Sequence, residues 1–210
     1  MISFIIRCFI KNREDVKNPE DRRQYGVLCS LVGIGLNICL FAGKYAAGAI
    51  SGSIAIMADA FNNLSDAGSS LITLIGFKFA GMKPDKEHPF GHGRIEYLSG
   101  LAVALAIVLM GIELGKSSVE KIISPTAVDT SLLSIGILVV SIAVKLYMSR
   151  YNRNIGKKID SAAMKATAAD SLSDAAATSV VLLAMLALHF TGYNIDGWGG
   201  VPLALFLISP

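Results

Sequence analysis

The chain has 210 residues, of which 53% are hydrophobic and 17% are charged, with a mean hydropathy of +0.56 and a formal net charge of +3. This composition is too apolar for an ordinary soluble domain, so it predicts a membrane protein with no nucleic-acid partner. The three cysteines show no pairing pattern and are interpreted as packing residues. The apolar opening is short, carries Arg7 and leads into a charged segment, so we expect no secretory signal.

Apolar runs separated by polar segments predict an all-α membrane protein, a bundle of six transmembrane helices. Residues 1–23 are expected to form a solvated cytoplasmic arm and residues 24–210 the transmembrane domain. Lys145, near the end of the fourth apolar run, is expected to extend to the membrane interface. The sixth run is too short to cross about 30 Å of bilayer comfortably. The expected helices cover residues 25–50, 54–79, 97–114, 131–148 and 161–190, and the sixth run covers residues 198–210.

The most informative stretch is ADAFNNLSDA, residues 58–67, inside the second apolar run. Its polar side chains would each cost several kcal/mol if left unpaired in hydrocarbon, so a polar partner must meet them. Asn62 and Asp66 are four residues apart, a spacing that places both side chains on one face of a helix.

A second stretch, residues 166–175, repeats this pattern 108 positions later and shares the run Leu-Ser-Asp-Ala. Asp170 aligns with Asn62, and Asp174 aligns with Asp66. If the two helices face each other, one amide and three carboxylates converge. Three negative charges in one place require a cation, so the pattern predicts a site for a metal ion or for protons.

Carboxylate and amide oxygens are hard ligands, whereas zinc sites usually include His or Cys. The four oxygen residues therefore favour Mn²⁺, Mg²⁺ or Ca²⁺, and a small pocket completed by water suits Mn²⁺ best. Protons and metal would compete for the same carboxylates, which is the basis of an antiporter. The alternative is that these side chains only form hydrogen bonds between helices. Two roles are compatible with Asp59 and Asn63, lining of the ion pathway and packing between helices. Asn37 and Lys44 are interpreted as structural or interfacial.

The polar segment after the second helix is a second candidate site. Asp85, His88 and His92 could offer one oxygen and two imidazoles to a metal such as zinc. Equally, both histidines could bond the backbone of a turn built on Pro89 and two glycines, with Arg94 and Glu96 pairing or capping the third helix. The third histidine, His189, is interpreted as interfacial.

Basic residues predict the orientation in the membrane. Thirteen Lys and Arg residues flank one set of helix ends and two flank the other. By the positive-inside rule, the N-terminus and the even-numbered loops are then cytoplasmic. The second and fifth helices run in opposite directions, so the two motif copies resemble the halves of an inverted repeat that meet near mid-membrane.

Three stretches carry a resemblance to a known family: ADAFNNLSDAGSS, DKEHPFGHGRIEYLSG and ADSLSDAAATS. From about Arg22 onward the chain is similar to the transmembrane domain of the cation diffusion facilitators, which are divalent-metal/proton antiporters. The resemblance implies a transport site on Asn62, Asp66, Asp170 and Asp174, and a second, less general site on Asp85, His88 and His92. The absence of histidine from the quartet is similar to the manganese-exporting branch.

The resemblance also implies a homodimer in the plasma membrane and alternating access, with no catalytic activity and no resident cofactor. Family members normally complete the sixth helix and add a cytoplasmic metal-binding domain, which we expect to be absent here. The leading hypothesis is Mn²⁺ export driven by protons; Fe²⁺, Zn²⁺ or Co²⁺ export and a truncated, non-transporting subunit are the alternatives. An intramembrane aspartyl protease is disfavoured by the third acid, the Asn and the lack of YD and GxGD sequences.

Overall fold

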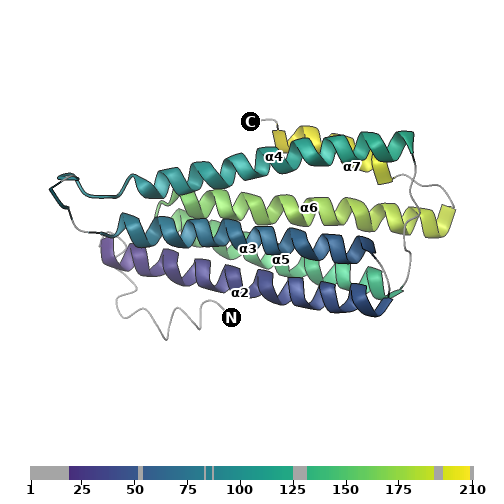
Figure 1. Cartoon of the computed structure of the whole chain (residues 1–210), viewed down its shortest axis with the longest axis horizontal. Helices are drawn as coiled ribbons and strands as arrows, with labels where there is room; N and C mark the ends of the chain where they lie inside the picture. The colour runs from purple at the N-terminus through teal and green to yellow at the C-terminus, as the bar shows by residue number, and fades with distance from the viewer. Residues whose placement is uncertain are drawn as a thin grey trace.

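The structure, a computed structural model, describes residues 19–51, 54–82, 84–86, 88–124, 132–191 and 196–208. Every regular element within these ranges is an α-helix, and the helices run along one common axis (Figure 1). This is the predicted all-α bundle with a short last helix. The helices are α2 (Pro19–Ser51), α3 (Ile54–Ala80), α4 (Ile95–Ile123), α5 (Leu132–Lys158), α6 (Ala162–Thr191) and α7 (Asp196–Ile208).

Four of the described helices, α2, α4, α5 and α6, are long and apolar enough to cross a bilayer. Helix α3 is also long, with 27 residues, and its middle carries the polar motif. The apolar part of α7, Trp198–Ile208, is shorter than a spanning segment. The chain is therefore a multi-pass membrane protein in which α3 carries a group of polar side chains.

The helices associate in pairs. Helix α2 packs mainly on α3, α5 on α6, and α4 on α7. Figure 1 shows α4 and α7 together at one edge of the bundle and α6 between them and the remaining helices. Small residues permit this close approach: a side chain on Gly100 of α4 would meet the backbone nitrogen of Ala163 at 3.1 Å. Helix α6 is therefore the most enclosed element of the bundle.

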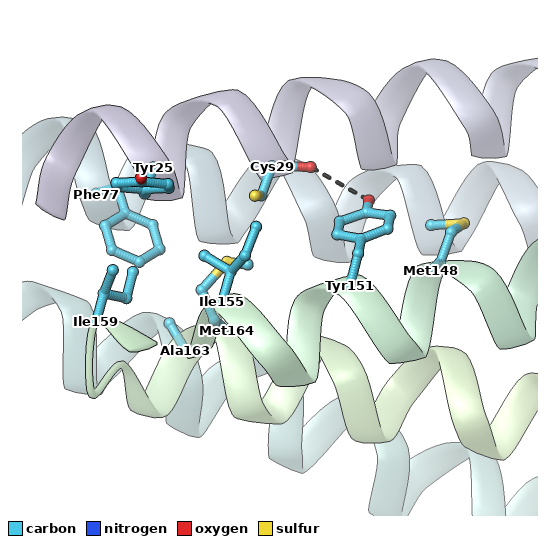
Figure 2. Packing of buried hydrophobic residues seen from close by; sticks show 9 residues of the cluster. All are labelled: Tyr25, Cys29, Phe77, Met148, Tyr151, Ile155, Ile159, Ala163 and Met164. Atoms are coloured by element: carbon cyan, nitrogen blue, oxygen red, sulfur yellow. Dashed lines mark hydrogen bonds between the residues drawn. The ribbon is translucent and has the colours of Figure 1, made fainter. Parts of the chain in front are cut away.

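A hydrophobic cluster fills one end of the bundle (Figure 2). Tyr151 of α5 points toward α2, where its hydroxyl donates a hydrogen bond to the carbonyl oxygen of Cys29 at 3.3 Å. Cys29 is buried there, in agreement with its predicted packing role. The cluster joins α2, α3, α5 and α6 and consists of Tyr25, Cys29, Phe77, Met148, Tyr151, Ile155, Ile159, Ala163 and Met164.

The tight turn between α5 and α6, residues 159–161, is held by Arg22 of α2. The Arg22 guanidinium donates to the carbonyl oxygens of Ile159 (2.8 Å) and Asp160 (3.1 Å) and pairs with the buried carboxylate of Glu96 (2.9 Å). Of the two predicted roles of Arg94 and Glu96, the mutual pair is wrong, because Glu96 pairs with Arg22, whereas Arg94 does occupy the N-cap position of α4. Arg22 was also expected in a solvated arm, whereas it joins α2 to α4 and to this turn. The end of the bundle that contains this turn, residues 159–161, is called the α5–α6 end.

Several predicted boundaries are wrong. Helix α2 begins at Pro19, six residues before the predicted start at residue 25, and residues 1–18 lie outside the described residues. Helices α4 and α5 continue to Ile123 and Lys158, through segments predicted as loops. Apolar residues mark only the part of a helix that lies in hydrocarbon. Backbone hydrogen bonding continues through Lys, Glu and Arg, which are good helix formers.

Candidate metal centre

The structure brings three of the four predicted transport-site residues together. Asp66 of α3 and Asp170 and Asp174 of α6 each offer a carboxylate oxygen, and these oxygens lie within 4.8 Å of one another. Asp66 and Asp170 are buried, and Asp174 is nearly so. The repeated four-residue spacing therefore places acids from two helices at one point, as the sequence predicted.

Lys145 lies inside this acidic cluster. Its Nζ donates to Oδ2 of Asp66 at 2.5 Å and to Oδ2 of Asp174 at 2.7 Å, and the residue is only 2% exposed. The prediction that Lys145 reaches the interface is wrong. Helix α5 continues to Lys158, so Lys145 is thirteen residues from the helix end, roughly 20 Å at 1.5 Å per residue and too deep for a lysine to extend out.

Asn62, the fourth predicted ligand, lies one turn before Asp66 on α3, and its side chain is exposed. Its neighbour Asn63 is buried and donates to the carbonyl oxygen of Asp59 at 3.0 Å, which is a packing role. Asp59 itself pairs with Lys44 of α2 at 2.8 Å. Lys44 is therefore structural, as predicted, and the α3 motif is divided between the acidic cluster and contacts with α2.

On the side of the cluster nearer the α5–α6 end, α3 and α6 are tied together. Thr73 and Thr167 share a hydrogen bond of 2.9 Å between their hydroxyl oxygens. Helix α5 is also bonded to α6, because the Ser149 hydroxyl donates to the carbonyl oxygen of Ala168 at 2.8 Å. The exposed Asn62 lies on the opposite side of the cluster. Helix α6 is therefore bonded to α3 and to α5 on the side of the cluster nearer the α5–α6 end, whereas the Lys44–Asp59 pair joins α2 to α3 on the other side.

The cluster can bind a cation through oxygen atoms alone. When all four groups are ionised, its three carboxylates and one ammonium carry a formal net charge of −2, which a divalent cation balances. The described part of this group contains no histidine or cysteine. Hard oxygen ligands of this kind suit Mn²⁺, Mg²⁺ or Ca²⁺ better than softer metals.

The predicted loop residues also come together. Asp85, His88 and His92 each place a ligand atom within 4.8 Å of the others. The Asp85 carboxylate lies 3.2 Å from Nδ1 of His88 and 3.6 Å from Nε2 of His92. The Nδ1 atom of His92 is buried and has no hydrogen-bond partner in the described structure. These contacts allow a metal site of one oxygen and two nitrogens.

The same loop also forms the predicted turn. The amide of Gly91 donates to the carbonyl oxygen of His88 at 2.9 Å, and Gly91 adopts a φ of +77°, which glycine tolerates best. Asp85 accepts a hydrogen bond of 2.6 Å from the His88 amide. The two interpretations of this segment are therefore compatible, because the turn itself brings the three side chains together. The side chain of His189 lies outside the described residues.

Lys145 is the residue of the site that sequence reasoning missed. A signal was present: a single cation lies within an otherwise apolar run of a chain that places three acids in the membrane. A charge at that depth is costly unless it is paired. The prediction considered only the position of Lys145 in the apolar run, and it did not consider the three acids as partners for the lysine.

Buried acids on spanning helices are typical of membrane proteins that move ions. Comparison with known proteins gives the particular family: residues 30–209 match the model described as the cation efflux transmembrane domain, so the chain belongs to the cation efflux family, the cation diffusion facilitators. The predicted resemblance is confirmed.

Among its relatives, the chain is 36% identical to an uncharacterized transporter, MJ0449, of Methanocaldococcus jannaschii, over 86% of this chain and 63% of the relative. It is 30% identical to the manganese efflux system protein MneS of Bacillus subtilis, over 81% of this chain and 59% of MneS. It is 29% identical to mitochondrial metal transporter 1 of Saccharomyces cerevisiae, over 90% of this chain and 42% of the relative. The chain thus spans about half the length of the curated relatives it matches.

Proposed function

We propose that this protein exports divalent metal cations across the plasma membrane in exchange for protons, with Mn²⁺ as its main substrate. The observation that carries the proposal is the meeting of Asp66, Asp170 and Asp174 from two helices. Their hard oxygen atoms favour Mn²⁺ over zinc. The similarity to a protein named for manganese efflux supports the same substrate.

In this proposal the three carboxylates bind the metal, and the amide oxygen of Asn62 completes the site with water. Asn62 shares a helix face with Asp66 and lies one turn from it, and in this proposal its oxygen turns toward the cluster when the metal binds. The metal is the cargo. Carboxylates must be deprotonated to bind a metal ion, so protons that reach the site from one side of the membrane promote release.

The positive-inside rule supports a cytoplasmic N-terminus. Under that orientation the α5–α6 end lies at the cytoplasmic surface, and the bonds of α6 to Thr73 and Ser149 lie on the cytoplasmic side of the cluster. We further propose that the transporter is a homodimer, as the family resemblance implies, and that Asp85, His88 and His92 bind a second metal at the cytoplasmic surface. The nitrogen ligands of this second site suit zinc as well as Mn²⁺.

The test is metal flux in proteoliposomes under an inward proton gradient, with Mn²⁺ and Zn²⁺ measured side by side. We expect Mn²⁺ flux to exceed Zn²⁺ flux and to vanish in Asp174→Ala. Glu113→Gln, which removes an exposed acid on α4, is the matched control and should retain flux. Faster transport of Zn²⁺, Fe²⁺ or Co²⁺ would contradict the substrate. Binding that depends on Asp174 without flux would indicate a non-transporting subunit, and no dependence on Asp174 would disprove the site.

A further inference from the structure

The position of Lys145 conflicts with direct binding of a metal ion. Its Nζ lies 2.5 Å from Asp66 and 2.7 Å from Asp174. Divalent cations bind carboxylate oxygens at roughly 2.0–2.6 Å, so an ion bridging the same two oxygens would lie about where Nζ lies. Two like charges cannot share that position in a low-dielectric interior. A metal ion that enters the cluster must therefore displace the ammonium.

A displaced ammonium needs new acceptors, since an unpaired charge in the bundle is costly. Four buried side-chain oxygen atoms lack a hydrogen-bond partner in the described structure, and two of them are Oγ of Ser141 and Oδ1 of Asn37. Both residues are only 1% exposed. Ser141 lies one turn before Lys145 on the same face of α5, and Asn37 lies on α2, which contacts α5. One of these oxygens is therefore available on the lysine's own helix and the other on the neighbouring helix α2.

We propose that Lys145 is a built-in counter-cation that occupies the carboxylates in the metal-free carrier and moves to Ser141 and Asn37 when a divalent ion binds. The inference rests on the proposed transport site. Its consequence is that the carboxylates always have a cation partner, whether the carrier is loaded or empty. Lys145 also determines specificity, because a monovalent ion replaces the ammonium without any gain in charge, whereas a divalent ion adds one.

The first experiment measures Mn²⁺ affinity of the purified full chain by calorimetry at pH 8, where competition from protons is weak. Lys145→Met keeps the length of the side chain and removes the competing charge. We expect Mn²⁺ to bind at least about tenfold more tightly, the lower end of what close charge pairs contribute. Lys44→Met removes another buried ammonium, the partner of Asp59, and is the matched control. We expect its affinity for Mn²⁺ to remain within about threefold of wild type, because Lys44 bonds none of the three clustered acids.

The second experiment tests the new position of the ammonium by double-mutant cycles. Ser141→Ala and Asn37→Leu should each weaken Mn²⁺ binding several-fold in the wild-type background, because the displaced ammonium loses an acceptor. In the Lys145→Met background neither substitution should change Mn²⁺ affinity. This coupling is specific to the lysine, and a general packing defect would not reproduce it.

The outcomes separate this inference from the proposed function. Mn²⁺ binding that is unchanged or weaker in Lys145→Met, in protein that remains monodisperse, would overturn the inference while leaving the metal site in place. Lys145→Gln is the second variant if Lys145→Met does not fold, with the same expectation. Asp174→Ala reports on the site itself: if it binds Mn²⁺ as wild type does, the proposed site is wrong regardless of the behaviour of Lys145.

Discussion

The two copies of the repeated motif have the same spacing but different surroundings. On α6, Asp170 is buried and Asp174 nearly so, and both belong to the acidic cluster. On α3, Asp66 is buried in the same cluster, whereas Asn62 is exposed. Equivalent positions of one motif, Asn62 and Asp170, thus lie in opposite environments.

The difference follows from the positions of the two helices. Helix α6 contacts α3, α4, α5 and α7, whereas α3 packs mainly on α2 (Figure 1). Helix α6 also begins at a defined cap, since the Ser161 hydroxyl accepts a hydrogen bond of 3.2 Å from the amide of Met164. Its first turns are therefore held by neighbours and by its cap. Local spacing determines which side chains share a face, and the neighbouring helices determine which of them is enclosed.

The largest expected effect is the difference in Mn²⁺ affinity between the Asp170→Ala and Asn62→Ala variants. Asp170→Ala removes an enclosed charged ligand and should weaken Mn²⁺ binding about 100-fold or more, roughly 2.7 kcal/mol. Asn62→Ala removes a neutral, exposed oxygen and should weaken binding about tenfold at most. Calorimetry on the two variants in parallel measures the difference. Equal losses would show that the two copies act alike once metal is bound.

A second comparison tests how α6 is held at the α5–α6 end. Arg22→Met leaves the buried Glu96 carboxylate and two carbonyl oxygens without their donor, so we expect a loss of about 2 kcal/mol in stability. Arg23→Met breaks only an exposed pair with Glu20 on the same helix and should be close to neutral. Thermal unfolding in detergent measures both variants. A similar loss in both would mean that the bonds of Arg22 to the turn do not stabilise the bundle.

The smallest effect concerns Asp160, which adopts a φ of +46° in the turn before α6. A hydrogen bond from Lys165, together with its charge, holds the pKa of the Asp160 carboxyl below its usual value. A carboxyl whose pKa is lower in the folded state contributes stability above its unfolded pKa and loses that contribution as the pH falls through the folded pKa. Asp160→Asn should therefore lower the melting temperature slightly at pH 7.

The control for this prediction is Lys165→Met, which should lower the melting temperature at pH 7 by about as much as Asp160→Asn does. The difference between wild type and either variant should decrease below about pH 4, near the ordinary pKa of an aspartate. A difference that stays constant from pH 7 to acid pH would contradict the role of this ion pair.

The amino-acid sequence by itself determined the class of protein and the composition of the acidic site. Apolar runs predicted the all-α bundle, because a helix satisfies its own backbone hydrogen bonds in hydrocarbon. The four-residue spacings in each motif copy predicted shared helix faces, since 3.6 residues per turn is a local property. The loop cluster of Asp85, His88 and His92 was found for the same reason, because it lies within eight residues.

Only the tertiary structure decided which helices face each other. It placed Lys145 between two acids, left Asn62 exposed and gave Arg22 its partners on α4 and in the α5–α6 turn. These contacts join residues 29 to 138 positions apart in different elements of the bundle, and no local period relates such positions. Which charge meets which acid depends on packing between helices, and that packing exists only when the whole bundle has assembled.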